Sequence, residues 1–364
     1  MRRLSQKTKA RLVRKQQWVL KQWAKIHRAV ACAIYKNKKK KRARAKRPYI
    51  PAVRYRAPAA VTIEHPLYRS QLLAFLEQIR EHFKNKQNRT LLIDFSKTEN
   101  FVSAGTLLLY AELNRLIAYS SGAVKLRCTE PANDRSSQVL KQVGIYRLCS
   151  NNSSVKTNRS DVVHWQVAQG QLVDNSLCAP AIEGYQDRLE TEMIDELLGG
   201  LGEAMTNAIH HAYDSIRQDG LDYKGTTDWW MFSQEKEGRL SVVICDLGIG
   251  IPTTLPLKRP NIWQKLILRK PTPTDSDCIR EAIVEGHTRT SLDGRGYGLG
   301  NIVDVVENTM GGVVVVYSNH GRYDSRSVTP YPLDYDDSIM GTMIFWNVPM
   351  KSKSKSKSKL NRSS

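Results

Sequence analysis

The chain has 364 residues, of which 41% are hydrophobic and 25% charged, so it is long and apolar enough for two or three folded domains. This composition excludes a disulfide-stabilised miniprotein, a fibre and a wholly disordered polymer. The net charge of +21 is concentrated at the ends, because residues 1–60 hold 21 of the 56 Lys and Arg and no acid, and the last 14 residues hold six bases and no acid. Residues 61–350 carry 29 bases and 35 acids, so they form a mildly acidic body between two basic ends.

The N-terminal segment, residues 1–60, is predicted to be a basic amphipathic helix followed by an extended linker. Residues 6–46 contain no Pro or Gly, and apolar residues recur at helical spacing from Leu12 to Ile34. The helix is expected to end before Pro48. Its charge favours nucleic-acid binding through residues 1–47. An anionic membrane, a partner's groove, or packing on the body or on a second subunit fits the same pattern.

A first folded unit is expected at 61–150. Short β-type runs at 91–95 and 124–128 alternate with helical patterns at 107–117 and 136–148, which is typical of an α/β domain. A connector rich in Ser and Asn, residues 151–160, leads to the next unit.

The second unit, residues 161–350, is predicted to begin with a long helix at about 189–216. Strands are expected at 227–232, 240–245, 313–317 and 342–348, and an irregular segment rich in Pro and Thr at 253–293. The tail, 351–364, alternates Lys and Ser and has no apolar residues to bury beyond one Leu, so we expect it to be disordered.

The long helix carries Glu203 and Asn207 one turn apart, opposite its apolar stripe. An amide oxygen can ligate the Mg²⁺ of a metal-bound phosphate, and a carboxylate can orient a nucleophile. The same pair is also typical of a solvated polar face.

Asp246, Gly248 and Gly250 follow the strand at 240–245 directly. A carboxylate at this position can accept a hydrogen bond from the amine of adenine, and the glycines let the backbone approach a flat base. An ordinary strand-to-loop turn uses the same residue types.

A third segment places Gly296, Gly298 and Gly300 ahead of a predicted helix. Successive backbone N–H groups at the start of a helix can bind phosphate. The segment lacks the third glycine of the dinucleotide fingerprint, and no G-x-x-x-x-G-K-[ST] loop occurs, which excludes a P-loop enzyme.

Taken in order, these segments resemble the motifs of the GHKL ATPases (gyrase, Hsp90, histidine kinases and MutL). Gly341 and Thr342 are similar to the final strand of that superfamily, whose threonine supports the adenine-binding aspartate. The resemblance covers about 188–350. It implies a two-layer α/β sandwich of the Bergerat type, with a mixed sheet on one side, helices on the other and a lid at 253–293.

The resemblance also implies ATP and Mg²⁺ as cofactors. Glu203 would be the general base and Asn207 the Mg²⁺ ligand, and the remaining residues would bind the nucleotide: Asp246 and Thr342 at adenine, Gly248 and Gly250 along the base, and Gly296, Gly298 and Gly300 at the phosphates.

The run Glu203 to Tyr213 looks closest to the anti-sigma-factor serine kinases, which implies a protein partner of the sigma-regulator type. None of the eight histidines stands in the H-[DE] setting of a sensor histidine kinase. We therefore expect an ATP-dependent regulatory protein that hydrolyses ATP or transfers phosphate. The alternative is a nucleic-acid-associated protein in which ATP acts as a conformational switch. Dimerisation is left open.

Residues 61–150 resemble a STAS domain, on Leu92–Ser96 and on Phe101–Thr106. The resemblance implies a docking or regulatory module. Val102 and Ala104 depart from the family's phosphoacceptor loop, and Ser103 lies one position from the expected serine.

Six scattered cysteines without a C-x-x-C pair, and the lack of a long apolar segment, predict a cytoplasmic protein with no transmembrane helix.

Overall fold

The computed structural model describes residues 51–85, 90–221, 227–289, 299–304, 306–307, 311–326 and 333–351. The chain from Pro51 onward groups into one compact unit. The predicted basic helix, Gly296, Gly298 and the Lys-Ser tail beyond residue 351 lie outside the described residues.

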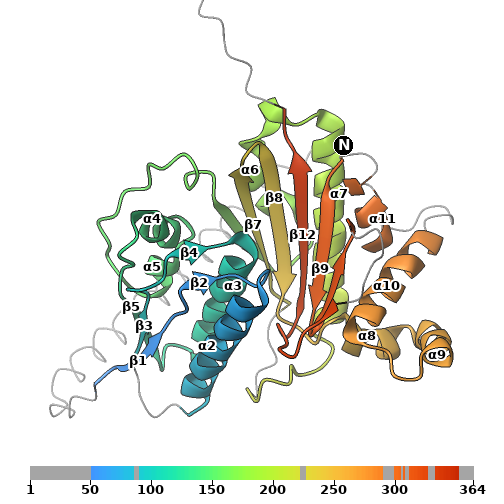
Figure 1. Ribbon diagram of the computed structural model, residues 1–364, viewed down its shortest axis with the longest axis horizontal. Helices are drawn as coiled ribbons and strands as arrows, with labels where there is room; N and C mark the ends of the chain where they lie inside the picture. The colour runs from blue at the N-terminus through green and yellow to red at the C-terminus, as the bar shows by residue number, and fades with distance from the viewer. Residues whose placement is uncertain are drawn as a thin grey trace, which may run out of the picture. The chain divides into compact units, whose positions relative to one another are not determined.

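The largest element among the described residues is a seven-stranded sheet (Figure 1). Each neighbouring pair of its strands is antiparallel, so the predicted mixed sheet is wrong. One reason is the tight hairpin at Glu237 and Gly238, whose positive φ angles of 53° and 73° suit the twist of paired antiparallel strands. In spatial order the strands are β11 (Leu333–Asp334), β10 (Gly321–Asp324), β9 (Val313–Ser318), β12 (Thr342–Pro349), β8 (Arg239–Asp246), β7 (Trp229–Lys236) and β6 (Gln166–Gly170).

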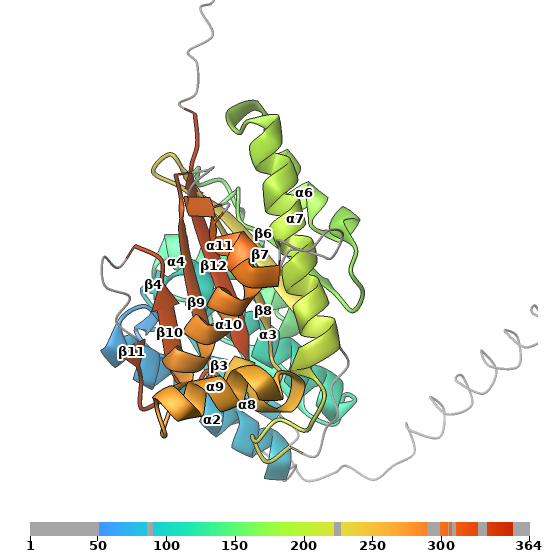
Figure 2. The ribbon, with the colours of Figure 1, turned by 90° about the vertical axis from the view of Figure 1, so that its right-hand side faces the viewer.

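Helices cover one face of this sheet, and Figure 2 shows them in front of the strands. Trp229, Val242, Ile344 and Trp346 point from the strands into the core beneath these helices. The predicted irregular segment is mostly helical where the structure describes it. Pro252 and Pro260 stand in the first turn of helices, where proline is favoured, and Pro256 lies inside the first of these helices. The helices after the first unit are α6 (Ala179–Glu183), α7 (Thr191–Asn207), α8 (Ile251–Lys258), α9 (Pro260–Arg269), α10 (Asp275–Arg289) and α11 (Leu299–Asp304), with a π-helix η3 at Ala208–Ala212 and 3₁₀ turns at Asn175–Leu177 and Gln186–Arg188.

The N-terminal α/β part contains a parallel sheet in the order β1-β3-β5 and a two-stranded parallel pair, β2 and β4. Strands β3 and β5 and helix α3 lie where the sequence predicts them, whereas β1 is formed by residues assigned to the linker. The predicted helix at 136–148 is broken at Gly144, whose φ is 85°. The elements are β1 (Val53–Arg56), β2 (Ala60–Val61), α2 (Pro66–Asn85), β3 (Thr90–Asp94), β4 (Asn100–Phe101), α3 (Ser103–Ser120), β5 (Lys125–Cys128), α4 (Asp134–Gln142) and α5 (Ile145–Leu148).

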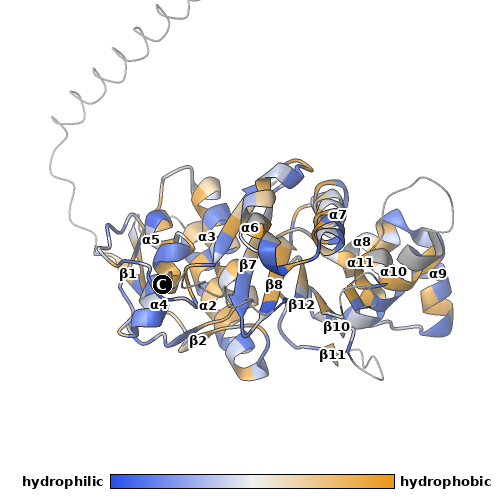
Figure 3. Ribbon diagram, turned by 90° about the horizontal axis from the view of Figure 1, so that it is seen from above, coloured by the Kyte–Doolittle hydropathy of each residue, from blue (hydrophilic) through white to orange (hydrophobic). Residues whose placement is uncertain are grey.

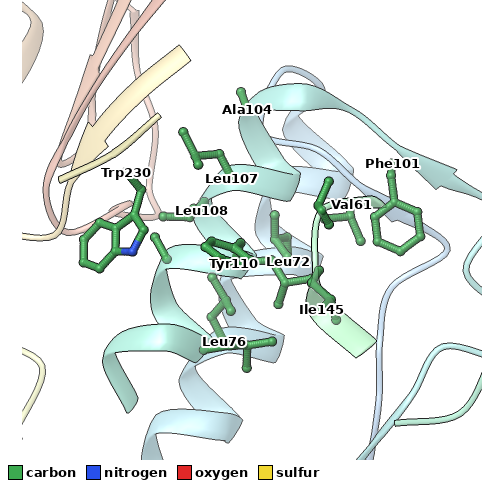
Figure 4. Close-up of a cluster of buried hydrophobic side chains, with 14 of the residues drawn as sticks. Val61, Leu72, Leu76, Phe101, Ala104, Leu107, Leu108, Tyr110, Ile145 and Trp230 are labelled. Carbon is green, nitrogen blue, oxygen red and sulfur yellow. The ribbon is translucent and has the colours of Figure 1, made fainter. Parts of the chain in front are cut away.

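The second face of the large sheet packs against this N-terminal part. Helix α3 contacts β7 and β8, and Figure 3 shows it on the side of these strands opposite α7. Trp230 of β7 lies beside Leu107 and Leu108 of α3 in one shared core (Figure 4). Strands that are apolar on both faces, such as β7 and β8, need cover on both sides. Within residues 161–350 the structure has the two predicted layers, a sheet and its helices, and the N-terminal part adds a third layer on the other face of the sheet.

A buried ion cluster joins α3 to the loop after the π-helix. Glu112 is fully buried and accepts hydrogen bonds from Arg80 (Nε to Oε1, 2.8 Å) and Arg217. Arg115 forms an ion pair of 2.7 Å with Asp219. Burial alone would raise the pKa of Glu112, but the surrounding guanidinium groups hold it well below its usual range. The cluster thus links the two parts of the compact unit by charge as well as by apolar packing.

Glu112→Ala is expected to lower the free energy of unfolding by about 3–5 kcal/mol, because it leaves buried guanidinium groups without their carboxylate. Urea unfolding measures the change. Glu77→Ala is the matched control, since Glu77 pairs with the same Arg80 from a half-exposed position and its loss should cost at most about 1 kcal/mol. Equal effects of the two substitutions would contradict the assigned role of the cluster.

Candidate functional site

Asp246 ends strand β8 and stands beside Thr342, the first residue of β12, in the antiparallel register. Its Oδ1 accepts hydrogen bonds from the backbone N–H groups of Gly248 (2.9 Å) and Thr342 (3.2 Å). Among the described residues, both bonds to this carboxylate go to Oδ1, so Oδ2 is the oxygen left for a ligand. The geometry fits a donor such as the exocyclic amine of adenine.

The protonation of Asp246 depends on its surroundings. Burial raises the pKa of Asp246 to about 6, and the two backbone hydrogen bonds and the charge of Arg217 oppose this rise. The carboxylate is therefore ionised at neutral pH and able to accept a hydrogen bond, but it becomes protonated in mild acid.

The Thr342 hydroxyl lies 3.1 Å from the hydroxyl of Ser318, the last residue of β9. Ser318 is fully buried and also accepts a hydrogen bond from the backbone N–H of Ile251 (2.8 Å). Thr342 thus binds Asp246 through its backbone N–H, whereas the hydroxyl of Thr342 contacts Ser318. Ser318 belongs to none of the predicted motifs, although a serine that ends the apolar run of β9 is a detectable signal.

Gly248 and Gly250 are required by contacts with the protein itself. A Cβ at Gly248 would collide with the carbonyl oxygen of Ala212, and one at Gly250 would collide with the side chain of Asn319. Gly250 also has a φ of 78°, which a side chain would strain. These contacts explain why glycine is needed at both positions. The binding of a nucleotide base along Gly248 and Gly250 stays a prediction.

Glu203 and Asn207 lie one turn apart on α7, as predicted from their spacing, and both are half-buried. Asn207 Nδ2 donates to Glu203 Oε1 over 3.4 Å, which leaves Asn207 Oδ1 available to a cation. Burial raises the pKa of Glu203, and the hydrogen bond from Asn207 partly offsets the rise. A raised pKa suits a carboxylate that accepts a proton during a reaction.

The helix of Glu203 and Asn207 ends against the loop that follows Asp246. Beyond Asn207 the chain forms the π-helix, and the carbonyl of its last residue, Ala212, accepts a hydrogen bond from Ile249 N–H (2.8 Å). The next residue, Tyr213, accepts a hydrogen bond from Leu247 N–H (3.1 Å) and donates one to the Asp228 carbonyl. These hydrogen bonds join the helix that carries Glu203 and Asn207 to the loop that follows Asp246. Spacing alone did not reveal the contribution of Tyr213.

The third motif is only partly described. Gly300 is buried in α11, whereas Gly296 and Gly298 lie outside the described residues. Helix α11 packs on α7, where Ile302 approaches Gly200, one turn before Glu203. The chain after the glycine segment therefore reaches the helix of Glu203, and phosphate binding by the three glycines stays a prediction.

The described residues contain no cluster of three or more His, Cys, Asp or Glu side chains that could hold a metal ion by themselves. A single amide ligand such as Asn207 fits a Mg²⁺ ion that takes its other ligands from phosphate and water.

Comparison with known proteins agrees with this geometry. Residues 180–316 match the family model of the histidine kinase-like ATPase domain. The match includes Glu203, Asn207, Asp246 and all three glycines of the second glycine segment, which supports a GHKL-type ATPase domain here and ATP as its ligand. Thr342 lies beyond the matched range. No curated protein matches the chain.

In the described part of the chain, no helix is both long enough and apolar enough to cross a membrane.

Proposed function

We propose that the ATPase-like part, residues 161–350, binds Mg-ATP and either hydrolyses it or transfers its γ-phosphate to a protein. The observation that carries the proposal is the pair of hydrogen bonds from Leu247 and Ile249 to Tyr213 and Ala212. They connect a carboxylate suited to adenine with a helix that carries a carboxylate and an amide suited to Mg-phosphate.

Each residue has a distinct part in the proposal. Asp246 Oδ2 accepts the hydrogen bond of the adenine amine, and Thr342 N–H holds the carboxylate in place. Asn207 Oδ1 ligates Mg²⁺, which neutralises phosphate charge when bound. Glu203 accepts the proton of an attacking water or hydroxyl while the new bond to phosphorus forms and the bond to the ADP oxygen breaks.

We propose that the N-terminal part, which resembles a STAS domain, serves as a docking or regulatory module and not as a phosphoacceptor. Ser103 is buried in the first turn of α3, and a Cβ at the nearby Gly105 would collide with the backbone of Thr62. A kinase would have to open this packing to reach the hydroxyl. The resemblance to anti-sigma-factor kinases supports a protein partner of the sigma-regulator type.

The test is incubation of the full chain with Mg²⁺ and γ-labelled ATP, with and without an extract of the source cells. Free labelled phosphate from the chain alone would establish an ATPase, and label on a protein of the extract would establish a kinase. If equilibrium dialysis detects no binding of ATP, the proposal is wrong.

The alternative, a nucleic-acid-associated protein with ATP as a switch, depends on the basic arm. Residues 1–47 lie outside the described residues, so this alternative rests on their charge alone.

A further inference from the structure

Asn319 connects the two loops that flank Asp246. It follows β9 directly and has a left-handed backbone with a φ of 50°. Its side chain donates from Nδ2 to the carbonyl of Ile249 (3.0 Å) and accepts at Oδ1 from the N–H of Gly341 (3.2 Å). Its own N–H donates to the Gly341 carbonyl (3.1 Å). Asn319 thus bonds both loops at once.

These two loops are the ones that orient Asp246. The first loop supplies the N–H of Gly248 and the second leads into the N–H of Thr342, and both groups bind Asp246 Oδ1. Gly341 is so close to Asp246 that a Cβ there would collide with the Asp246 carbonyl oxygen. A change in the distance between the loops would therefore change the direction of the carboxylate.

Arg69 of α2 reaches Asn319 from the N-terminal part. Its Nη2 donates to the carbonyl of Asn319 (3.4 Å) and to the carbonyl of Asp337 (3.1 Å), and its guanidinium lies 4.0 Å from the centre of the Tyr335 ring. The residue is fully buried, and burial lowers its pKa.

Burying the Arg69 guanidinium costs folding free energy, so stability by itself does not account for an arginine at this position. Its Nε and Nη1 have no hydrogen-bond partner within the described ranges. An apolar side chain of similar length would avoid the desolvation of a cation. Besides its contact with the Tyr335 ring, the arginine supplies the pair of hydrogen bonds to the carbonyls of Asn319 and Asp337.

We propose that Arg69 and Asn319 are positioning residues for adenine recognition, and that the N-terminal part controls base selectivity through them. The inference rests on the proposed function and deepens it. The sequence of contacts runs from α2 through Arg69 to Asn319, then to Ile249 and Gly341, and ends at Asp246.

The experiment compares the affinities of ATP and GTP in the full chain and in two variants, Arg69→Met and Asn319→Gly. Glycine tolerates the left-handed backbone of Asn319 and removes only the side chain. Both variants should lower the ratio of ATP to GTP affinity by about five- to tenfold, as expected for the loss of one or two well-placed hydrogen bonds. Arg69→Met should leave the thermal unfolding midpoint unchanged or raise it.

Ser70→Ala is the matched control. Ser70 is the next residue of α2, and its hydroxyl donates to the Asp337 carboxylate and not to Asn319. The ratio of ATP to GTP affinity in Ser70→Ala should therefore equal that of the wild type. An unchanged ratio of ATP to GTP affinity in both variants would overturn the inference. So would an equal loss of affinity for ATP and GTP together with a lower thermal unfolding midpoint. If the wild type itself did not prefer ATP, the adenine assignment would fail and this inference with it.

Discussion

Glu203→Gln is expected to lower ATP turnover by about 10²–10⁴-fold, the contribution typical of a positioned general base. ATP affinity should stay within about twofold of the wild type, because glutamine has the same shape and can still accept the hydrogen bond from Asn207. Release of labelled phosphate measures turnover, and equilibrium dialysis measures binding.

The control for this prediction is Glu192→Gln, the same chemical change in the first turn of the same helix, where the side chain is exposed. It should leave turnover unchanged. Undiminished turnover in Glu203→Gln would show that Glu203 is not the base, although ATP could still bind at the same site.

Asp246→Asn is expected to weaken ATP binding by about 10–100-fold and to shift preference toward GTP. The side-chain amide would present an N–H₂ group either to the backbone donors of Gly248 and Thr342 or to the adenine amine, so a donor would face a donor in both orientations. Guanine carries a carbonyl at the corresponding position and would accept that hydrogen bond. Titration of both nucleotides measures the shift.

The pKa of Asp246, raised to about 6, adds a pH dependence to this result. The ionised carboxylate is the form that accepts the adenine hydrogen bond, so the preference for ATP should be nearly complete at about pH 7, be about halved near pH 6, and approach a tenfold fall per pH unit well below pH 6. The ratio to GTP is the appropriate measure, because the phosphates of both nucleotides titrate alike.

In Asp246→Asn the ratio should be independent of pH in this range. Asp161→Asn, a partly exposed carboxylate paired with Arg135, should keep the profile of the wild type. A wild-type ratio that stays constant from pH 7 to pH 5 would contradict the role of Asp246.

Several features of the protein were determined by the sequence alone. The apolar runs that form β8, β9 and β12 and the periodicity of α3 and α7 predicted those elements near their observed bounds, because short-range patterns decide which side of a helix or strand is apolar. Local spacing also placed Glu203 one turn from Asn207, and the resemblance to the GHKL ATPases implied the contact between Asp246 and Thr342, which are partners in neighbouring strands.

Other features were decided only by the tertiary structure. The apolar side chains of β7 and β8 indicate that both faces are buried, but they do not say that α3 covers one of them. The antiparallel order of the sheet depends on where β12 inserts, which local pattern does not encode.

The same holds for the surroundings of the site. Arg69 and Asn319 are 250 positions apart, and no motif connects them. The pKa of Asp246 reflects its burial in the folded protein and the charge of Arg217, which lies 29 positions away in the chain. Hydrogen bonding and desolvation act over a few ångströms in space. A local motif can therefore identify a site residue such as Asp246, but residues distant in the chain determine its orientation and its pKa.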